Sequence, residues 1–249
     1  MSDRFAICHP ITAAWEGGWS DHKADPGGKT MYGVTEAVFH AWLKAQGKAV
    51  RPVKSITKAE ALAIYRKNYW DACGAPTLKP GVDLAVYDAS VNSGVSRGLK
   101  WLKASIGSND HSVTVKRICR ARLSFMQSLK IWQSFGRGWG RRVADIEVKG
   151  VAMALGAMGA TEKRIRADAA AEAEAAKKAA KTADTTAKTT GAGGVSAGGA
   201  TAIDAGAMDP AALWVLGAIA ALAIGAAVVL YVKKRAYDAR AVAYAEAAA

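Results

Sequence analysis

The stretch "WEGGWSDHKADPGGKT" at residues 15–30 separates a helical pattern from an irregular, glycine-rich segment. Apolar residues recur at roughly helical spacing over residues 3–16, and the pair Gly17-Gly18 is a natural end for a helix. Glu16 therefore lies at the end of the expected helix, between two tryptophans. The residues after it, 17–34, predict turns with a short hairpin.

The rest of the chain to about residue 157 predicts a mainly α fold. Thr35 is a candidate N-cap, and the pair Thr57 and Glu60 has the capping-box pattern. Gly94 is a natural stop for the helix before it. The expected helices after the first one cover residues 35–45, 57–70, 82–92, 96–105, 112–134 and 139–157.

The opening stretch holds two carboxylates in contrasting surroundings. Trp15 and Trp19 flank Glu16 and are expected to raise the pKa of its carboxyl by excluding water. Asp25 lies in a polar Asp-Pro-Gly-Gly setting that keeps a carboxylate ionised. Such a pair supplies the acid, and the base or electrostatic stabiliser, of glycoside hydrolysis. The hydroxyl of Thr30 is a candidate to orient the attacking water.

Each further candidate has a plain structural alternative. Asp25 before Pro-Gly-Gly is also typical of a residue that caps a turn. His22 is a candidate substrate contact or an exposed loop histidine, and Asn92 either contacts sugar or holds the cleft together. The tryptophans Trp15 and Trp19 are also candidates to bind substrate. The glycine pair at 27–28 lacks the Gly-Lys-Ser/Thr sequence of a phosphate-binding loop, which excludes nucleotide binding at that spacing.

The pattern Glu-Gly-Gly-Trp-x5-Asp-Pro-Gly-Gly-x-Thr-x-x-Gly-Val-Thr, residues 16–35, resembles the signature of the glycoside hydrolase 108 family of N-acetylmuramidases. "VYDASVNSG" at 86–94 is similar to a second family segment. "FGRGWGRRV" at 135–143 resembles the predicted peptidoglycan domain that accompanies the family. The resemblance implies a lysozyme-like helical domain that cleaves peptidoglycan, with Glu16 as the catalytic acid. More distantly, the Glu–Asp–Thr order resembles phage-type lysozymes, with Thr30 one residue closer to Asp25.

The resemblance implies a muramidase domain at residues 1–95 and a helical peptidoglycan-associated module at residues 96–167, and the composition predicts three further segments after them. Residues 168–210 are an Ala/Lys/Gly/Thr-rich linker, in which AEAEAAKKAAK favours a solvated helix and the glycine-rich remainder a flexible tether. Residues 233–249 are a short basic and then Ala-rich tail. Residues 211–232 carry no charge and are long enough as a helix to cross a bilayer, so they predict a transmembrane helix.

The charge and the cysteine content limit the kinds of partner and cofactor that are expected. The formal net charge is +13, and residues 1–168 hold 26 Lys and Arg against 14 Asp and Glu. A basic globular part suggests an anionic partner, for which an acidic wall polymer is simpler than nucleic acid because no nucleic-acid-binding motif is present. Three scattered cysteines have neither metal-site spacing nor an even count, which argues against a zinc site and against a disulfide framework. No metal and no organic cofactor is expected.

The predicted localisation is the host inner membrane, with the catalytic domain acting in the periplasm. Lys233, Lys234 and Arg235 follow the predicted span, which places the C-terminus in the cytoplasm. No secretory signal peptide precedes the enzyme, so a holin or the anchor itself would provide access to the wall, and the protein would stay cytoplasmic until release.

Three functional interpretations remain open on the sequence. The first is an endolysin that hydrolyses the β-1,4 bond between N-acetylmuramic acid and N-acetylglucosamine during host lysis by a phage or prophage. The second is a lytic transglycosylase, which also depends on a single glutamate. The third is a membrane-tethered wall-binding or secretion-helper protein without enzymatic activity.

Overall fold

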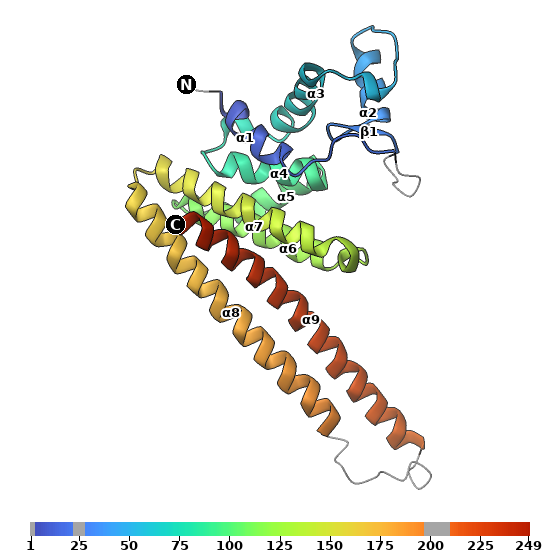
Figure 1. The fold of residues 1–249 in the computed structure, drawn as a ribbon, viewed down its shortest axis with the longest axis vertical. Helices are drawn as coiled ribbons and strands as arrows, with labels where there is room; N and C mark the ends of the chain where they lie inside the picture. The colour runs from blue at the N-terminus through green and yellow to red at the C-terminus, as the bar shows by residue number, and fades with distance from the viewer. Residues whose placement is uncertain (1–2, 22–27, 197–209) are drawn as a thin grey trace. The chain divides into compact units, whose positions relative to one another are not determined.

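The computed structural model describes residues 3–21, 28–196 and 210–249, and it describes the side chains of these residues outside 191–220. The chain is mainly helical (Figure 1). Contacts divide it into two compact units, one of Met1–Phe125 with Ile146–Thr161 and one of Met126–Asp145 with Glu162–Ala249. Helix α7 contributes to both units.

The first unit contains short helices and one small hairpin. Strands β1 and β2 pair in antiparallel fashion, with Thr30 opposite Thr35 and Met31 opposite Val34. Short 3₁₀ turns cover Val53–Ser55 and Ala75–Thr77, and a π-helical turn, η2, covers Arg66–Asp71. The other elements are α1 (Arg4–Ala13), β1 (Thr30–Met31), β2 (Val34–Thr35), α2 (Glu36–Ala45), α3 (Lys58–Tyr65), α4 (Val82–Ser93), α5 (Val95–Ser105), α6 (His111–Gln127) and α7 (Trp132–Ala157).

The capping signals in the sequence are confirmed. The side chain of Thr35 accepts a hydrogen bond from the Val38 backbone N–H at the start of α2. Thr57 and Glu60 form both bonds of the capping box at the start of α3. Gly94 ends α4 with φ +89°, a conformation that residues with a Cβ rarely adopt.

Helix α4 is the centre of the first unit. Every residue from Val82 to Ser90 is buried, including the charged residues Asp83 and Asp88. The rings of Phe5, Trp70 and Tyr87 form an edge-to-face cluster with centroid separations of 5.4–6.0 Å. This cluster joins α1, η2 and α4 into one apolar core.

Two ion pairs fix other helices to α4. The Arg4 guanidinium of α1 donates to both carboxylate oxygens of Asp83, at 2.7 and 3.0 Å. The Arg122 guanidinium of α6 donates to Asp88 at 2.5 Å, and both of these side chains are fully buried. Removing one partner of such a pair would leave a buried charge uncompensated, so the pairs enforce one arrangement of the helices.

The second unit is dominated by the antiparallel helices α8 (Glu162–Ser196) and α9 (Pro210–Ala248), which lie side by side (Figure 1). The predicted linker is thus helical as far as Ser196, beyond the solvated helix expected at its start. The helix is also packed rather than solvated, because alanine side chains are buried every three or four residues and such small residues let two helices approach closely. These alanines are Ala169, Ala173, Ala176, Ala180 and Ala183.

The transmembrane helix predicted at 211–232 is not supported. Within the described part of the chain, no helix combines the length and apolar character needed to cross a bilayer. The side chains of α9 are described from residue 221 onward, and its apolar part ends at charged residues. These are Lys233, Lys234, Arg235 and Asp238. The side chains of residues 211–220, the first ten of the predicted span, lie outside the described residues.

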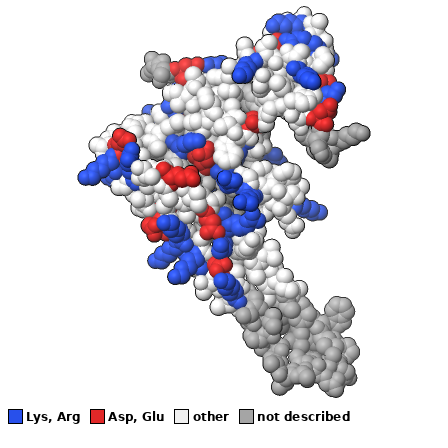
Figure 2. Space-filling view, in the orientation of Figure 1, with Lys and Arg blue, Asp and Glu red and all other residues white. Residues whose placement is uncertain are grey.

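Lys and Arg side chains are more prominent than acidic ones on the face shown in Figure 2, in line with the net charge of +13 for the whole chain. In the first unit, basic residues gather in the C-terminal part of α2 and in the segment that leads to α3. These residues are Lys44, Lys48, Arg51, Lys54 and Lys58.

Candidate functional site

Glu16 lies in the wall of a cavity of about 360 Å³ in the first unit. Ligand pockets in proteins commonly begin at about 300 Å³, so the space suits one or two sugar rings. Apolar side chains and the Gly17-Gly18 pair form part of the wall, and titratable or aromatic side chains form the rest. The lining residues are His9, Ala13, Glu16, Gly17, Gly18, Tyr32, Lys58, Ala61, Leu62 and Tyr65.

The end of α1 positions Glu16. After Ala13 the chain continues in a tight turn, in which the Glu16 backbone N–H donates to the Ala13 carbonyl at 3.0 Å. His9, Ala13 and Glu16 follow one another at spacings of four and three residues. They therefore project from one side of the helix and its terminal turn, toward the cavity.

The turn between β1 and β2 packs directly against the glutamate. A Cβ added to Gly33 would lie 2.2 Å from the Tyr65 hydroxyl and 3.0 Å from Oε2 of Glu16. Gly33 also has φ +73°. Glycine is thus required at this position both for backbone conformation and for space, and its neighbours fix the location of the carboxylate.

Tyr65 of α3 holds this turn in place. Its hydroxyl donates a hydrogen bond to the Tyr32 carbonyl at 3.1 Å. Its ring lies 4.9 Å from the His9 ring, centroid to centroid. Tyr65 therefore joins the hairpin turn to α1 across the back of the cavity.

His9 also forms a polar contact within the core of the first unit. Its Nδ1 lies 2.7 Å from the hydroxyl of Tyr87. Burial lowers the pKa of His9 and raises the pKa of Tyr87. Both shifts favour the neutral form of each side chain, so the contact is a hydrogen bond between an uncharged imidazole and an uncharged phenol.

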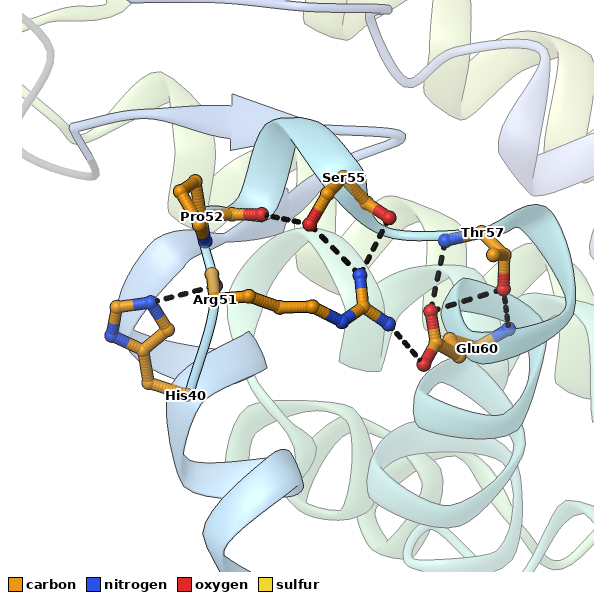
Figure 3. A network of polar contacts seen from close by, with 6 residues as sticks. All are labelled: His40, Arg51, Pro52, Ser55, Thr57 and Glu60. Atoms are coloured by element: carbon orange, nitrogen blue, oxygen red, sulfur yellow. Dashed lines mark hydrogen bonds and ion pairs between the residues drawn. The ribbon is translucent and has the colours of Figure 1, made fainter. Parts of the chain in front are cut away.

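A polar network supports the α3 wall of the cavity (Figure 3). The guanidinium of Arg51 donates to the Ser55 carbonyl at 2.6 Å and to Glu60 Oε1 at 2.5 Å. Glu60 Oε2 accepts from the Thr57 backbone N–H at 2.9 Å. The bond from Arg51 holds the pKa of Glu60 below its usual value. The network fixes the first turn of α3, the turn that carries Lys58 to the cavity.

The residues predicted to act with Glu16 are not found together in the cavity wall. Asp25 and His22 lie outside the described residues. Thr30 pairs with Ser20 through its backbone, and its hydroxyl donates to the Gly28 carbonyl at 3.1 Å, so this side chain closes the base of the loop. Thr30 is not among the described residues that line the cavity.

The two tryptophans also lie away from the cavity wall described here. Trp15 is half-buried beyond the end of α1, whereas the Trp19 side chain is 41% exposed with the Lys54 ammonium 5.3 Å from its ring centre. The wall near Glu16 instead contains His9 and Tyr65. A substrate-binding role for either tryptophan stays a prediction.

Asn92 has a structural partner. Its side-chain oxygen accepts a hydrogen bond from the Arg122 guanidinium at 3.1 Å, and the same guanidinium pairs with Asp88. The Asp-x-x-x-Asn-x-Gly segment therefore fastens the end of α4 to α6. These contacts favour the structural alternative for Asn92 over a contact with sugar.

Four titratable or aromatic cavity residues were not predicted from the sequence: His9, Tyr32, Lys58 and Tyr65. A sequence signal exists only for His9, which lies seven residues before Glu16 and hence on the same side of a helix. Lys58 and Tyr65 come from α3, far along the chain, and no local pattern links them to Glu16. Across the described residues, no group of three or more His, Cys, Asp or Glu lies together as a metal site would require.

Comparisons with known proteins agree on the segment that contains this site. A family model described as glycosyl hydrolase 108 matches residues 10–94, which include Glu16, the hairpin turn, α3 and α4. No curated protein matches the chain. Among solved structures, the SagA protein of Brucella abortus is similar, with 33% identity and a TM-score of 0.53 over 61% of this chain and 95% of that chain. The chain belongs to the glycosyl hydrolase 108 family, a membership that supports glycoside hydrolase activity and points to peptidoglycan as the substrate.

Proposed function

We propose that this protein is an N-acetylmuramidase that hydrolyses the β-1,4 bond between N-acetylmuramic acid and N-acetylglucosamine, with Glu16 as the general acid. The observation that carries the proposal is the location of Glu16 in a cavity wall, within the segment that the family model matches. A glutamate at a helix end followed by a short β-hairpin also suits the lysozyme-like arrangement expected from the sequence.

The proposed chemistry requires a proton donor beside the glycosidic oxygen. The Glu16 carboxyl donates its proton to the leaving-group oxygen while the sugar ring develops oxocarbenium character. The open Gly17-Gly18 backbone gives a bulky glycan access to the carboxyl, since a Cβ at either glycine would meet nothing within 4 Å. Asp25, or a water molecule held near it, acts on the opposite face of the sugar.

Zymography against purified peptidoglycan tests the assignment of Glu16. The full chain should clear the substrate, and Glu16→Gln should reduce clearing by roughly 10²-fold or more, because the variant cannot donate the proton. Asp21→Asn, an exposed neighbour in the same loop, is the matched control and should retain activity. Full clearing by Glu16→Gln would show that the mechanism is wrong.

Mass spectrometry of the released fragments separates the two enzymatic interpretations. Hydrolysis leaves reducing N-acetylmuramic acid ends, whereas a lytic transglycosylase leaves anhydro ends. We expect reducing ends only. Absence of any released fragment, together with retention on insoluble wall, would favour the non-enzymatic wall-binding interpretation.

Wall binding by the first half of α7 is a second part of the proposal. Phe135 is 56% exposed and stacks on Trp139 at 5.7 Å between ring centres, and Arg137 and Arg141 are exposed nearby in sequence. Arg142 is buried and therefore does not belong to this surface. We expect the double variant Arg137→Glu with Arg141→Glu to pellet less with purified sacculi. Unchanged pelleting would show that this surface does not bind the wall.

The proposed reaction takes place at the wall, so we expect the first unit to act in the periplasm during host lysis. Association of residues 211–232 with the inner membrane, and the need for a holin, stay predictions from the sequence. Protease accessibility of the first unit in spheroplasts tests the location. Protection from protease after lysis has begun would contradict it.

A further inference from the structure

The turn that packs against Glu16 contains a residue in an unfavourable backbone conformation. Tyr32 has φ +52°, and it is the one non-glycine residue with positive φ in the part of the chain that the structure describes. Together with Gly33 it forms a two-residue loop between β1 and β2 in which both φ values are positive. Such loops strongly prefer asparagine, aspartate or glycine at the position that Tyr32 occupies.

The turn itself gives no reason for a tyrosine. The Tyr32 backbone carbonyl accepts the hydrogen bond from the Tyr65 hydroxyl, and any residue type supplies that carbonyl. A tyrosine in the left-handed region costs stability relative to asparagine or glycine. Strained conformations of this kind cluster at active sites and ligand-binding positions.

The location of Tyr32 suggests what that requirement is. The residue is half-buried, lines the cavity, and directly precedes Gly33, where an added Cβ would lie 3.0 Å from Oε2 of Glu16. An aromatic ring presents a large, rigid apolar face at low entropic cost. The C–H groups of a pyranose ring offer a matching apolar face, so a sugar bound beside Glu16 can pack against such a ring.

We propose that Tyr32 is a substrate-binding residue whose ring packs against the N-acetylhexosamine ring bound beside Glu16. This inference rests on the proposed function, because it takes the cavity to be a glycan site. The hairpin turn accepts a strained backbone so that an aromatic side chain faces the sugar, and the hydrogen bond from Tyr65 holds the turn in that conformation.

The experiment measures binding without turnover. Titration calorimetry measures the affinity of the full chain carrying Glu16→Gln for a soluble tetrasaccharide of alternating N-acetylglucosamine and N-acetylmuramic acid. Tyr32→Asn, which places a preferred residue in the turn, should weaken binding by about tenfold while raising the melting temperature by roughly 2–4 °C. Tyr32→Phe, which keeps the ring, should bind within about twofold of its parent.

The outcomes separate this inference from the proposed function. If Tyr32→Asn binds as tightly as its parent, the substrate-binding role of Tyr32 is wrong and the muramidase proposal is unaffected. If Tyr32→Asn lowers the melting temperature, the ring supports the fold and the inference is also overturned. If the Glu16→Gln parent itself fails to bind the tetrasaccharide, the proposed function fails and this inference fails with it.

Discussion

Gly33 is the residue at which the fold and the candidate site depend on each other most directly. A Cβ there would meet the Tyr65 hydroxyl at 2.2 Å and Oε2 of Glu16 at 3.0 Å, in a backbone conformation with φ +73°. We expect Gly33→Ala to destabilise the protein by about 2–4 kcal/mol and to reduce peptidoglycan clearing at least tenfold. Thermal melts and zymography measure the two effects.

Gly47 provides the matched control for this substitution. It has φ +65°, but a Cβ there would meet nothing within 4 Å. Gly47→Ala should therefore cost about 1 kcal/mol through backbone strain alone and leave clearing unchanged. If Gly33→Ala matched Gly47→Ala in both measurements, the contact with Glu16 would have no consequence.

His9 predicts a pH dependence of stability. Burial lowers its pKa in the folded state below the ordinary value of 6.5, so the unfolded chain binds the proton first as pH falls. The folding free energy should therefore weaken as pH drops below about 6.5 and level off below the folded pKa. His9→Gln should flatten this part of the melting-temperature profile between pH 7 and pH 5. His40→Gln is the control, and an equal flattening in both variants would contradict the assignment.

At the scale of elements, the first turn of α3 is the local structure on which one cavity wall depends. Thr57→Ala removes the N-cap of this helix and leaves Glu60 without one of its donors. We expect a loss of about 1 kcal/mol in urea unfolding, with Thr57→Ser close to the parent because it keeps the cap. Equal stability of the Ala and Ser variants would mean that Arg51 alone holds this turn.

The boundary between α6 and α7 was predicted at the wrong residues. The spacing predicted helices over 112–134 and 139–157, whereas α6 ends at Gln127 and α7 begins at Trp132. No glycine or proline marks the break, and the glycines that do occur lie inside α7. A Cβ at Gly136 would lie 2.4 Å from the Trp132 ring, so this glycine makes room for an aromatic side chain within a continuous helix.

At the scale of the whole molecule, the second unit depends on close approach of α8 and α9. Ala176 is 1% exposed on the buried stripe, whereas Ala175 next to it is exposed. Ala176→Leu should separate the helices by overpacking and expose the lysines of α8 to trypsin several-fold faster, while Ala175→Leu leaves digestion unchanged. Peptidoglycan clearing, which we assign to the first unit, should be the same in both variants. Equal digestion rates would show that the alanine stripe does not govern the packing.

The helical class, the capped starts of α2 and α3, and the end of α4 at Gly94 were predictable from the sequence. These features depend on backbone groups and side chains within about four residues of one another, so short patterns encode them. A local pattern also identified Glu16 at a helix end. No local pattern could identify Tyr65 or Lys58 as cavity residues, because they come from a helix more than forty residues away.

The sequence by itself determined the helical class, the capped starts of α2 and α3, and which glutamate is the candidate acid. Only the tertiary structure decided what surrounds that glutamate: a wall of His9, Tyr32 and Tyr65 in place of the tryptophans next to it in the chain. It also decided that the alanine-rich segment packs as a helix against α9. The physical reason is that burial and close contact are made between segments distant along the chain, where no local spacing rule applies.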